Sequence, residues 1–150
     1  MPGDFEVVGT EKLRALGVAM KTADKPLKAE IRRSLRKGVK PGVDGARARA
    51  RATLPKRGGV NEVIARSRMN TQIKTGGRVT QLRVTSRTHD PRIDRGELRH
   101  PTHGHGDRWV VQRVPSGWFT QAMKQAAPAI RSELIVSMTA MTARLRSAAK

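Results

Sequence analysis

Four histidines and one aspartate are the residues of this sequence that could bind a metal ion. They are His89, His100, His103, His105 and Asp107. Imidazole and carboxylate groups are zinc ligands, and this many groups could fill a tetrahedral site. Their spacing matches no helical or strand motif that directs two ligands to one point, and the intervening glycines leave the segment poorly preorganised. We therefore predict no metal and no cofactor, and we interpret residues 86–107 as a contact loop.

The lysines and arginines could bind anions, because the chain carries 31 of them against 12 acidic residues and a formal net charge of +19. Such a charge favours nucleic acid, an acidic protein surface or anionic lipid as a partner. The candidate contact or DNA-facing residues are Arg32, Arg33, Arg36, Lys37, Lys40, Arg47, Arg49 and Arg51. No aromatic residues are interleaved with them, which argues against single-strand binding by stacking. Non-specific, salt-dependent phosphate contact stays open.

Other reaction chemistries find no support in the sequence. The glycine pairs at 58–59 and 76–77 are not followed by the Lys-Ser/Thr of a P-loop, and no serine lies in a Gly-x-Ser-x-Gly elbow. The absence of cysteine excludes disulfides and thiolate metal sites. We therefore predict that the protein is not an enzyme. Without an apolar run of membrane-spanning length or the features of a signal peptide, we expect a soluble protein made in a cytoplasm, with no membrane partner.

The candidate basic residues lie in a segment that the sequence predicts to be helical. After a short strand near residues 5–9, apolar spacing predicts a helical arm over about residues 10–53. Asp24 and Pro26 mark the start of its longer helix, over about 25–53. The segment 38–45 contains three glycines and Pro41, which predict that the long helix is kinked or interrupted there.

Strands and a closing helix fill the rest of the chain. Alternating residues predict a hairpin of strands at 69–74 and 79–85, and two further strands follow at 97–101 and 109–114. The sheet would span about residues 68–114. A three-four repeat of apolar residues then predicts a long helix over about 117–147. With so few aromatics in the chain, we expect Trp109, Trp118 and Phe119 to anchor the corner between strand and helix. The fold class is α+β: N-terminal helices, a small antiparallel sheet of three to four strands, and a C-terminal helix packed on the sheet, in one domain of residues 1–150.

The order of several short motifs resembles a known family. A basic arm ends in Leu54-Pro55-Lys56-Arg57-Gly58-Gly59, and a hairpin follows. Then come Gly96 to Pro101 with Gly104 close behind, Trp109-Val110-Val111-Gln112, and Gly117-Trp118-Phe119 at the start of a helix. Over about residues 10–147 this resembles the tail-completion, or head–tail joining, proteins of long-tailed bacteriophages, in the version of actinobacteriophages. The matching positions are Pro55, Gly58, Gly59, Arg99, His100, Pro101, Gly104, Trp109, Gly117, Trp118 and Phe119.

The resemblance implies a structural virion protein rather than an enzyme. Such a protein would be assembled in the host cytoplasm and would lie in the neck of the virion. It would form a ring, hexameric rather than dodecameric, between a head-side connector or stopper and the tail terminator or tail tube, with genome DNA passing through the lumen. The matching positions are then fold and contact positions, and we expect the basic arm and residues 86–107 to make the subunit contacts. Two alternatives stay open: a small basic nucleic-acid-binding protein, and a tail terminator on a related fold.

Overall fold

The α+β class is confirmed by a computed structural model, which describes residues 4–8, 14, 15, 18, 21, 23–75, 80–87, 91–102 and 105–148. The helices are α2 (Lys25–Thr53), α3 (Val60–Ala65) and α4 (Thr120–Ala148), with short 3₁₀ turns at Arg57–Gly59 and Pro91–Arg95. The strands are β1 (Asp4–Val8), β2 (Met69–Thr75), β3 (Thr80–Ser86), β4 (Glu97–Thr102) and β5 (His105–Arg113). The helix expected over about residues 10–22 lies largely outside the described residues.

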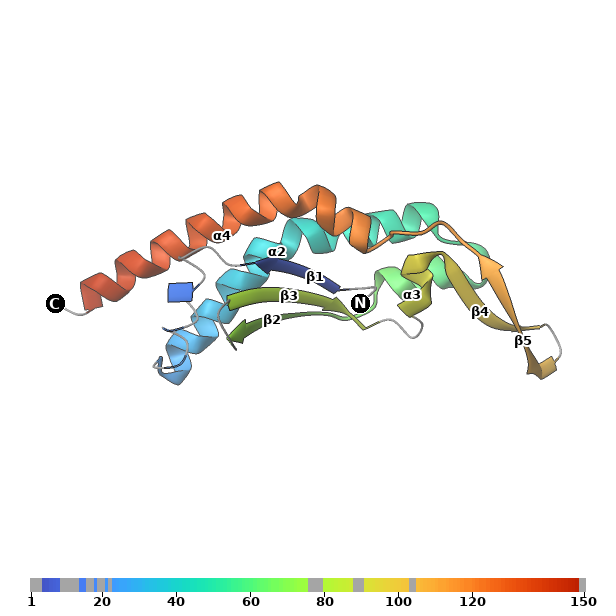
Figure 1. Cartoon of the computed structure of the whole chain (residues 1–150), viewed down its shortest axis with the longest axis horizontal. Helices are drawn as coiled ribbons and strands as arrows, with labels where there is room; N and C mark the ends of the chain where they lie inside the picture. Colours follow the sequence, from blue (N-terminus) through green and yellow to red (C-terminus); the bar gives the residue numbers. More distant parts are fainter. Residues whose placement is uncertain are drawn as a thin grey trace.

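The bounds of helix α2 follow from its capping residues. The Asp24 carboxylate accepts a hydrogen bond of 2.9 Å from the backbone N–H of Leu27, and Pro26 lies in the first turn. The helix runs without interruption through Pro41, and its axis bends along its length in Figure 1. The expected interruption near residues 38–45 is therefore absent, and α2 is a single bent helix.

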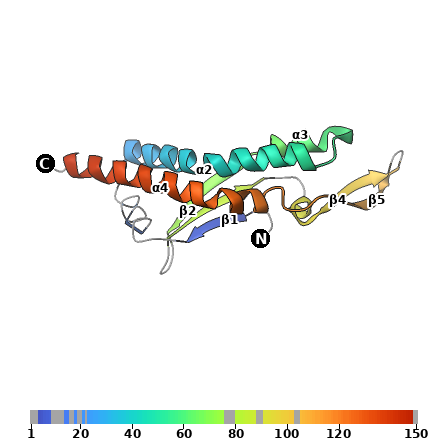
Figure 2. The ribbon, with the colours of Figure 1, turned by 90° about the horizontal axis from the view of Figure 1, so that it is seen from above.

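Two of the three glycines of α2, Gly38 and Gly42, are packing positions rather than helix breakers. A Cβ atom on Gly38 would lie 2.8 Å from Cδ2 of Leu134, and one on Gly42 would lie 2.6 Å from Sδ of Met123. Real Cβ contacts are essentially never that short, so α4 packs closely on α2 only because these side chains are missing. Figure 2 shows the two helices side by side, and α4 itself continues through Pro128.

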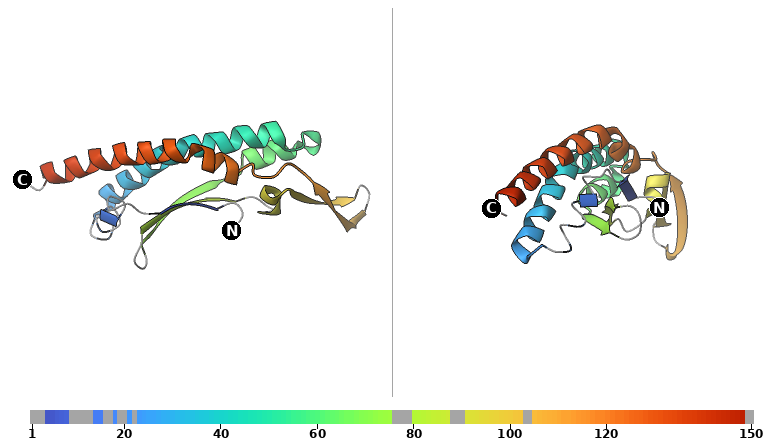
Figure 3. Two further views of the ribbon diagram at one scale, coloured as in Figure 1. Left: turned by 45° about the horizontal axis from the view of Figure 1, so that its top comes forward. Right: turned by 60° about the vertical axis from the view of Figure 1, so that its left-hand side comes forward.

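A three-stranded antiparallel sheet lies under this helix pair (Figure 3). The strand order is β1-β3-β2, so the central strand β3 pairs with both neighbours: Val84 lies opposite Phe5 of β1 and opposite Thr71 of β2. Leu82 and Val84 of β3 are buried, which confirms the alternation predicted for that strand. The closing helix packs mainly along α2, and it reaches the sheet at β1.

Strands β4 and β5 form a separate two-stranded ribbon that extends from one end of the molecule (Figures 1 and 3). The register pairs Glu97 with Arg113 and Pro101 with Trp109. The strands predicted at 97–101 and 109–114 are confirmed as β4 and β5, whereas the interpretation of residues 86–107 as a loop is wrong for residues 97–102 and 105–107, which belong to these strands. The alternating apolar pattern used to find strands is weak here, since the ribbon buries little on either face.

Candidate interaction surfaces

The base of the ribbon is fixed by the buried residue Asp94, which the sequence analysis did not single out. Its Oδ1 accepts hydrogen bonds from the backbone N–H of Phe119 (2.8 Å) and of Thr120 (3.3 Å), and its Oδ2 accepts one from the Thr120 hydroxyl. The Asp94 carbonyl also accepts the Gly117 N–H at 2.8 Å. Asp94 therefore caps the N-terminus of α4 from a distant part of the chain, where a carboxylate also complements the helix dipole.

Two glycines allow the chain to turn at this corner. Gly96 has φ of 94° and Gly117 has φ of 77°, both in the left-handed region that other residues rarely adopt. Gly96 also passes close to the backbone, because a Cβ there would lie 2.9 Å from the Val114 carbonyl oxygen. Beside them, Trp118 and Phe119 are almost fully buried with their rings 5.6 Å apart. The predicted role of these two aromatics as anchors of the corner is confirmed.

Trp109 does not anchor the core, contrary to the expectation from sequence. It is 52% exposed and lies on the same ribbon face as Val111, which is 58% exposed. The guanidinium of Arg99 lies 5.1 Å from the centre of the Trp109 ring, a cation–π contact that orders the side chain without burying it. Trp109 pairs with Pro101 in the ribbon, which extends away from the helices and the three-stranded sheet (Figure 1).

The opposite face of the ribbon borders an open groove of about 920 Å³. The groove lies between the ribbon and the turn that follows α2. Its lining residues are Pro55, Arg57, Gly58, Val60, Leu98, His100, Pro101, Thr102, Gly106 and Gln112. This places the predicted positions Pro55, Gly58, His100 and Pro101 together, although they are far apart in sequence. Nδ1–H of His100 donates to the Pro101 carbonyl at 3.0 Å.

The turn after α2 also contains the predicted pair Gly58 and Gly59, with φ of 74° and 72°. These positive φ values explain why glycine is used twice in succession. Gly104, by contrast, lies outside the described residues, as do His89 and His103. Among the residues that the structure describes, no three potential ligands of the His, Asp or Glu type come together.

The eight candidate cations of α2 differ in their surroundings. Arg32, Arg33, Arg36 and Lys37 are exposed, and within the described chain no ion pair involves them. Lys40 pairs with Asp44 one turn further along. Arg47 is half-buried against strand β2. Arg49 is half-buried and donates from Nη2 to the side chain of Gln121 on α4.

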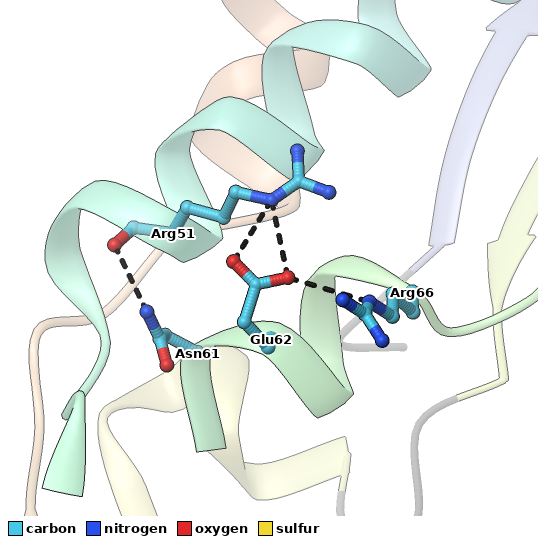
Figure 4. A network of polar contacts seen from close by, with 4 residues as sticks. All are labelled: Arg51, Asn61, Glu62 and Arg66. Carbon is cyan, nitrogen blue, oxygen red and sulfur yellow. Dashed lines mark hydrogen bonds and ion pairs between the residues drawn. The ribbon is translucent and has the colours of Figure 1, made fainter. Parts of the chain in front are cut away.

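Arg51 belongs to a local network with α3 (Figure 4). Its Nε lies 3.2 Å and 3.4 Å from the two carboxylate oxygens of Glu62, and Nε of Arg66 lies 3.4 Å from the same carboxylate. Asn61 donates from Nδ2 to the Arg51 carbonyl at 3.4 Å. This network holds α3 against the end of α2, so Arg51 is a fold contact rather than a free cation.

None of the helices in the described part of the chain is long and apolar enough to cross a membrane. Comparison of the whole chain with protein-family models, with curated proteins and with solved structures gave no match.

Proposed function

We propose that this chain is a structural protein of a bacteriophage neck, which assembles with copies of itself into a ring that joins the head connector to the tail. The order of motifs suggests the neck. The observation that carries the assembly role is the protruding β4–β5 ribbon with its exposed apolar side chains Trp109, Val110 and Val111. The protein acts through its surfaces and not as an enzyme.

The composition of the ribbon favours a protein partner. A two-stranded ribbon is marginally stable in water by itself, and neighbouring exposed apolar side chains mark surfaces that bind a partner. Aromatic residues are enriched in protein–protein interfaces, and charged residues are depleted at their centres. Trp109 and Val111 lie side by side on one face, and Glu97 and Arg113 pair at 3.1 Å at its base. That arrangement resembles the apolar centre and polar rim of an interface.

A ring also requires a second, different patch on each subunit, because subunits arranged head to tail meet through unlike surfaces. The outer face of α4 offers exposed Ile135 and Val136. The groove beside the ribbon offers another concave surface. The Asp94 corner fixes the direction of the ribbon relative to α4, so that every subunit would present its neighbour with the same angle.

The test is the mass of the purified protein by size-exclusion chromatography with light scattering. We expect a closed oligomer, alone or on mixing with the connector and tail proteins encoded beside it. The double variant Trp109→Ser/Val111→Ser should shift the protein to monomer. Val63→Ser is the matched control, since Val63 is 55% exposed and lies on α3 instead of the ribbon. A protein that stays monomeric with every neighbour would refute the proposal, and binding to the tail tube alone would assign the terminator role instead.

A further inference from the structure

The exposed side of α2 carries a row of cations that the ring does not explain. Five residues form this basic face: Arg33, Arg36, Lys37, Lys40 and Arg47. On a helix with 3.6 residues per turn they fall within an arc of about 100° and extend over about 21 Å. The buried residues of the same helix, such as Ile31, Leu35 and Gly42, lie on the other side.

Among the described residues, one of the five cations of the basic face, Lys40, has an acidic partner. Asp44 is the acidic residue within its arc, and it pairs with Lys40. Like charges three and four residues apart on a helix repel one another, and this face contains such pairs in Arg33–Lys37 and Arg36–Lys40. The face therefore works against the stability of the isolated helix, and an anionic partner would remove that repulsion.

A hollow of about 200 Å³ lies at the edge of the basic face, between α2 and β2. Arg36, Lys40 and Arg47 line it together with Thr71 and with Asp44, whose carboxylate pairs with Lys40. The Nε atom of Arg47 is shielded from solvent and has no hydrogen-bond partner among the described residues. An anionic oxygen in this hollow would meet Arg36, Arg47 and the Thr71 hydroxyl group, beside the Lys40–Asp44 ion pair.

The composition of the face favours nucleic acid over an acidic protein. Protein–DNA interfaces are more polar and much more positive than interfaces between proteins, whereas the centres of protein interfaces are apolar and depleted of charge. No large apolar side chain of α2 is exposed in the described chain. We infer that the basic face of α2 binds the phosphate backbone of duplex DNA without reading its sequence. This inference is independent of the neck role, because it depends on α2 and not on the ribbon.

The test is the salt dependence of binding to a short fluorescein-labelled DNA duplex of arbitrary sequence, followed by fluorescence anisotropy. Each phosphate contact contributes about 0.9 to the slope of log K against log salt concentration. The triple variant Arg33→Gln/Arg36→Gln/Lys37→Gln should reduce the slope by about 2.7. Glutamine is a good helix former, and circular dichroism checks that α2 is retained. The single variant Arg36→Gln, with an expected reduction of about 0.9, serves if the triple variant is unfolded.

The matched control removes the same charge elsewhere. Arg108, Lys124 and Arg131 are exposed on β5 and α4, and their triple change to Gln should leave the slope nearly unchanged. An equal reduction of the salt slope in both triple variants would overturn the inference, because DNA binding would then depend on net charge alone. Absence of DNA binding by the wild type would also overturn it, as would equally tight binding of polyglutamate. The Trp109→Ser/Val111→Ser variant should retain DNA binding. A result against the proposed ring can therefore be distinguished from a result against DNA binding by the basic face.

Discussion

Removal of the Asp94 carboxylate should destabilise the protein far more than loss of an ordinary helix cap. In Asp94→Ala, the N-terminus of α4 loses its cap, which costs about 1 kcal/mol. The buried N–H of Phe119 also loses its 2.8 Å partner, and a buried donor without an acceptor costs about 1–3 kcal/mol more. We expect the free energy of unfolding to fall by about 3 kcal/mol in total.

The matched comparison is Asp24→Ala at the start of α2. Asp24 makes the same kind of bond, to the Leu27 N–H at 2.9 Å, but it is exposed. Water can replace its carboxylate, so a loss of about 1 kcal/mol is expected there. The loss of unfolding free energy in Asp94→Asn should lie between those of Asp94→Ala and Asp24→Ala, because one side-chain oxygen remains as an acceptor for the Phe119 N–H.

The free energy of unfolding of the three variants is measured by urea unfolding with circular dichroism as the readout. The protein concentration is kept below that at which the protein assembles. The concentration matters because association of folded subunits would add to the apparent stability. An Asp94→Ala variant no less stable than Asp24→Ala would refute the reasoning. It would mean that the corner relaxes and that water reaches the N–H groups at the start of α4.

Three further outcomes follow from the packing of α2, each measured by urea unfolding. Gly42→Ala should lower the free energy of unfolding by about 1–3 kcal/mol, because its Cβ would overlap Met123. Gly45→Ala should raise it by about 0.5–1 kcal/mol, because no atom lies within 4 Å of that Cβ and alanine favours the helix. Equal effects at the two glycines would contradict the packing described for α4. A double-mutant cycle on Arg51 and Glu62 should give a coupling of about 0.2–1 kcal/mol, since both side chains are partly exposed, and a coupling near zero would mean that the network is incidental.

The sequence predicts those parts of the fold that depend on neighbouring residues. Asp24 and Pro26 mark the start of α2 because a cap and a first-turn proline act within one turn of the helix. The alternation around Leu82 and Val84 identifies β3 because one face of that strand is buried. In each case the physical cause lies within a few residues of its effect.

Contacts between distant segments account for the parts that the sequence does not predict. Gly38 and Gly42 are typical of a helix break, yet α4 lies against them and gives the continuous helix its close packing. The cap of α4 comes from Asp94 and not from the residues just before Thr120, where capping rules look for it. One feature of the sequence could have pointed to a structural role for Asp94. It is one of only 12 acidic residues in a strongly basic chain.

Trp109 and the basic residues of α2 show a second kind of limit. A sequence gives residue types, but whether a tryptophan is core or interface depends on what lies opposite it. Trp109 and Trp118 have the same chemistry, and the structure exposes the first and buries the second. In the same way, eight similar cations on α2 separate into exposed, paired and inward-facing groups only once Asp44, Glu62 and Gln121 are placed beside them.

The two proposed surfaces lie on different elements: the ribbon extends from one end of the long molecule (Figures 1 and 2), and the basic face occupies the middle turns of α2. Their chemistry differs as well. Burial of Trp109 and Val111 depends on the hydrophobic effect, which salt does not screen, whereas phosphate contacts weaken steeply as salt rises. Separation in space lets one subunit hold a protein neighbour and DNA together. If both proposals hold, the difference in chemistry would let the DNA be released while the protein contacts persist.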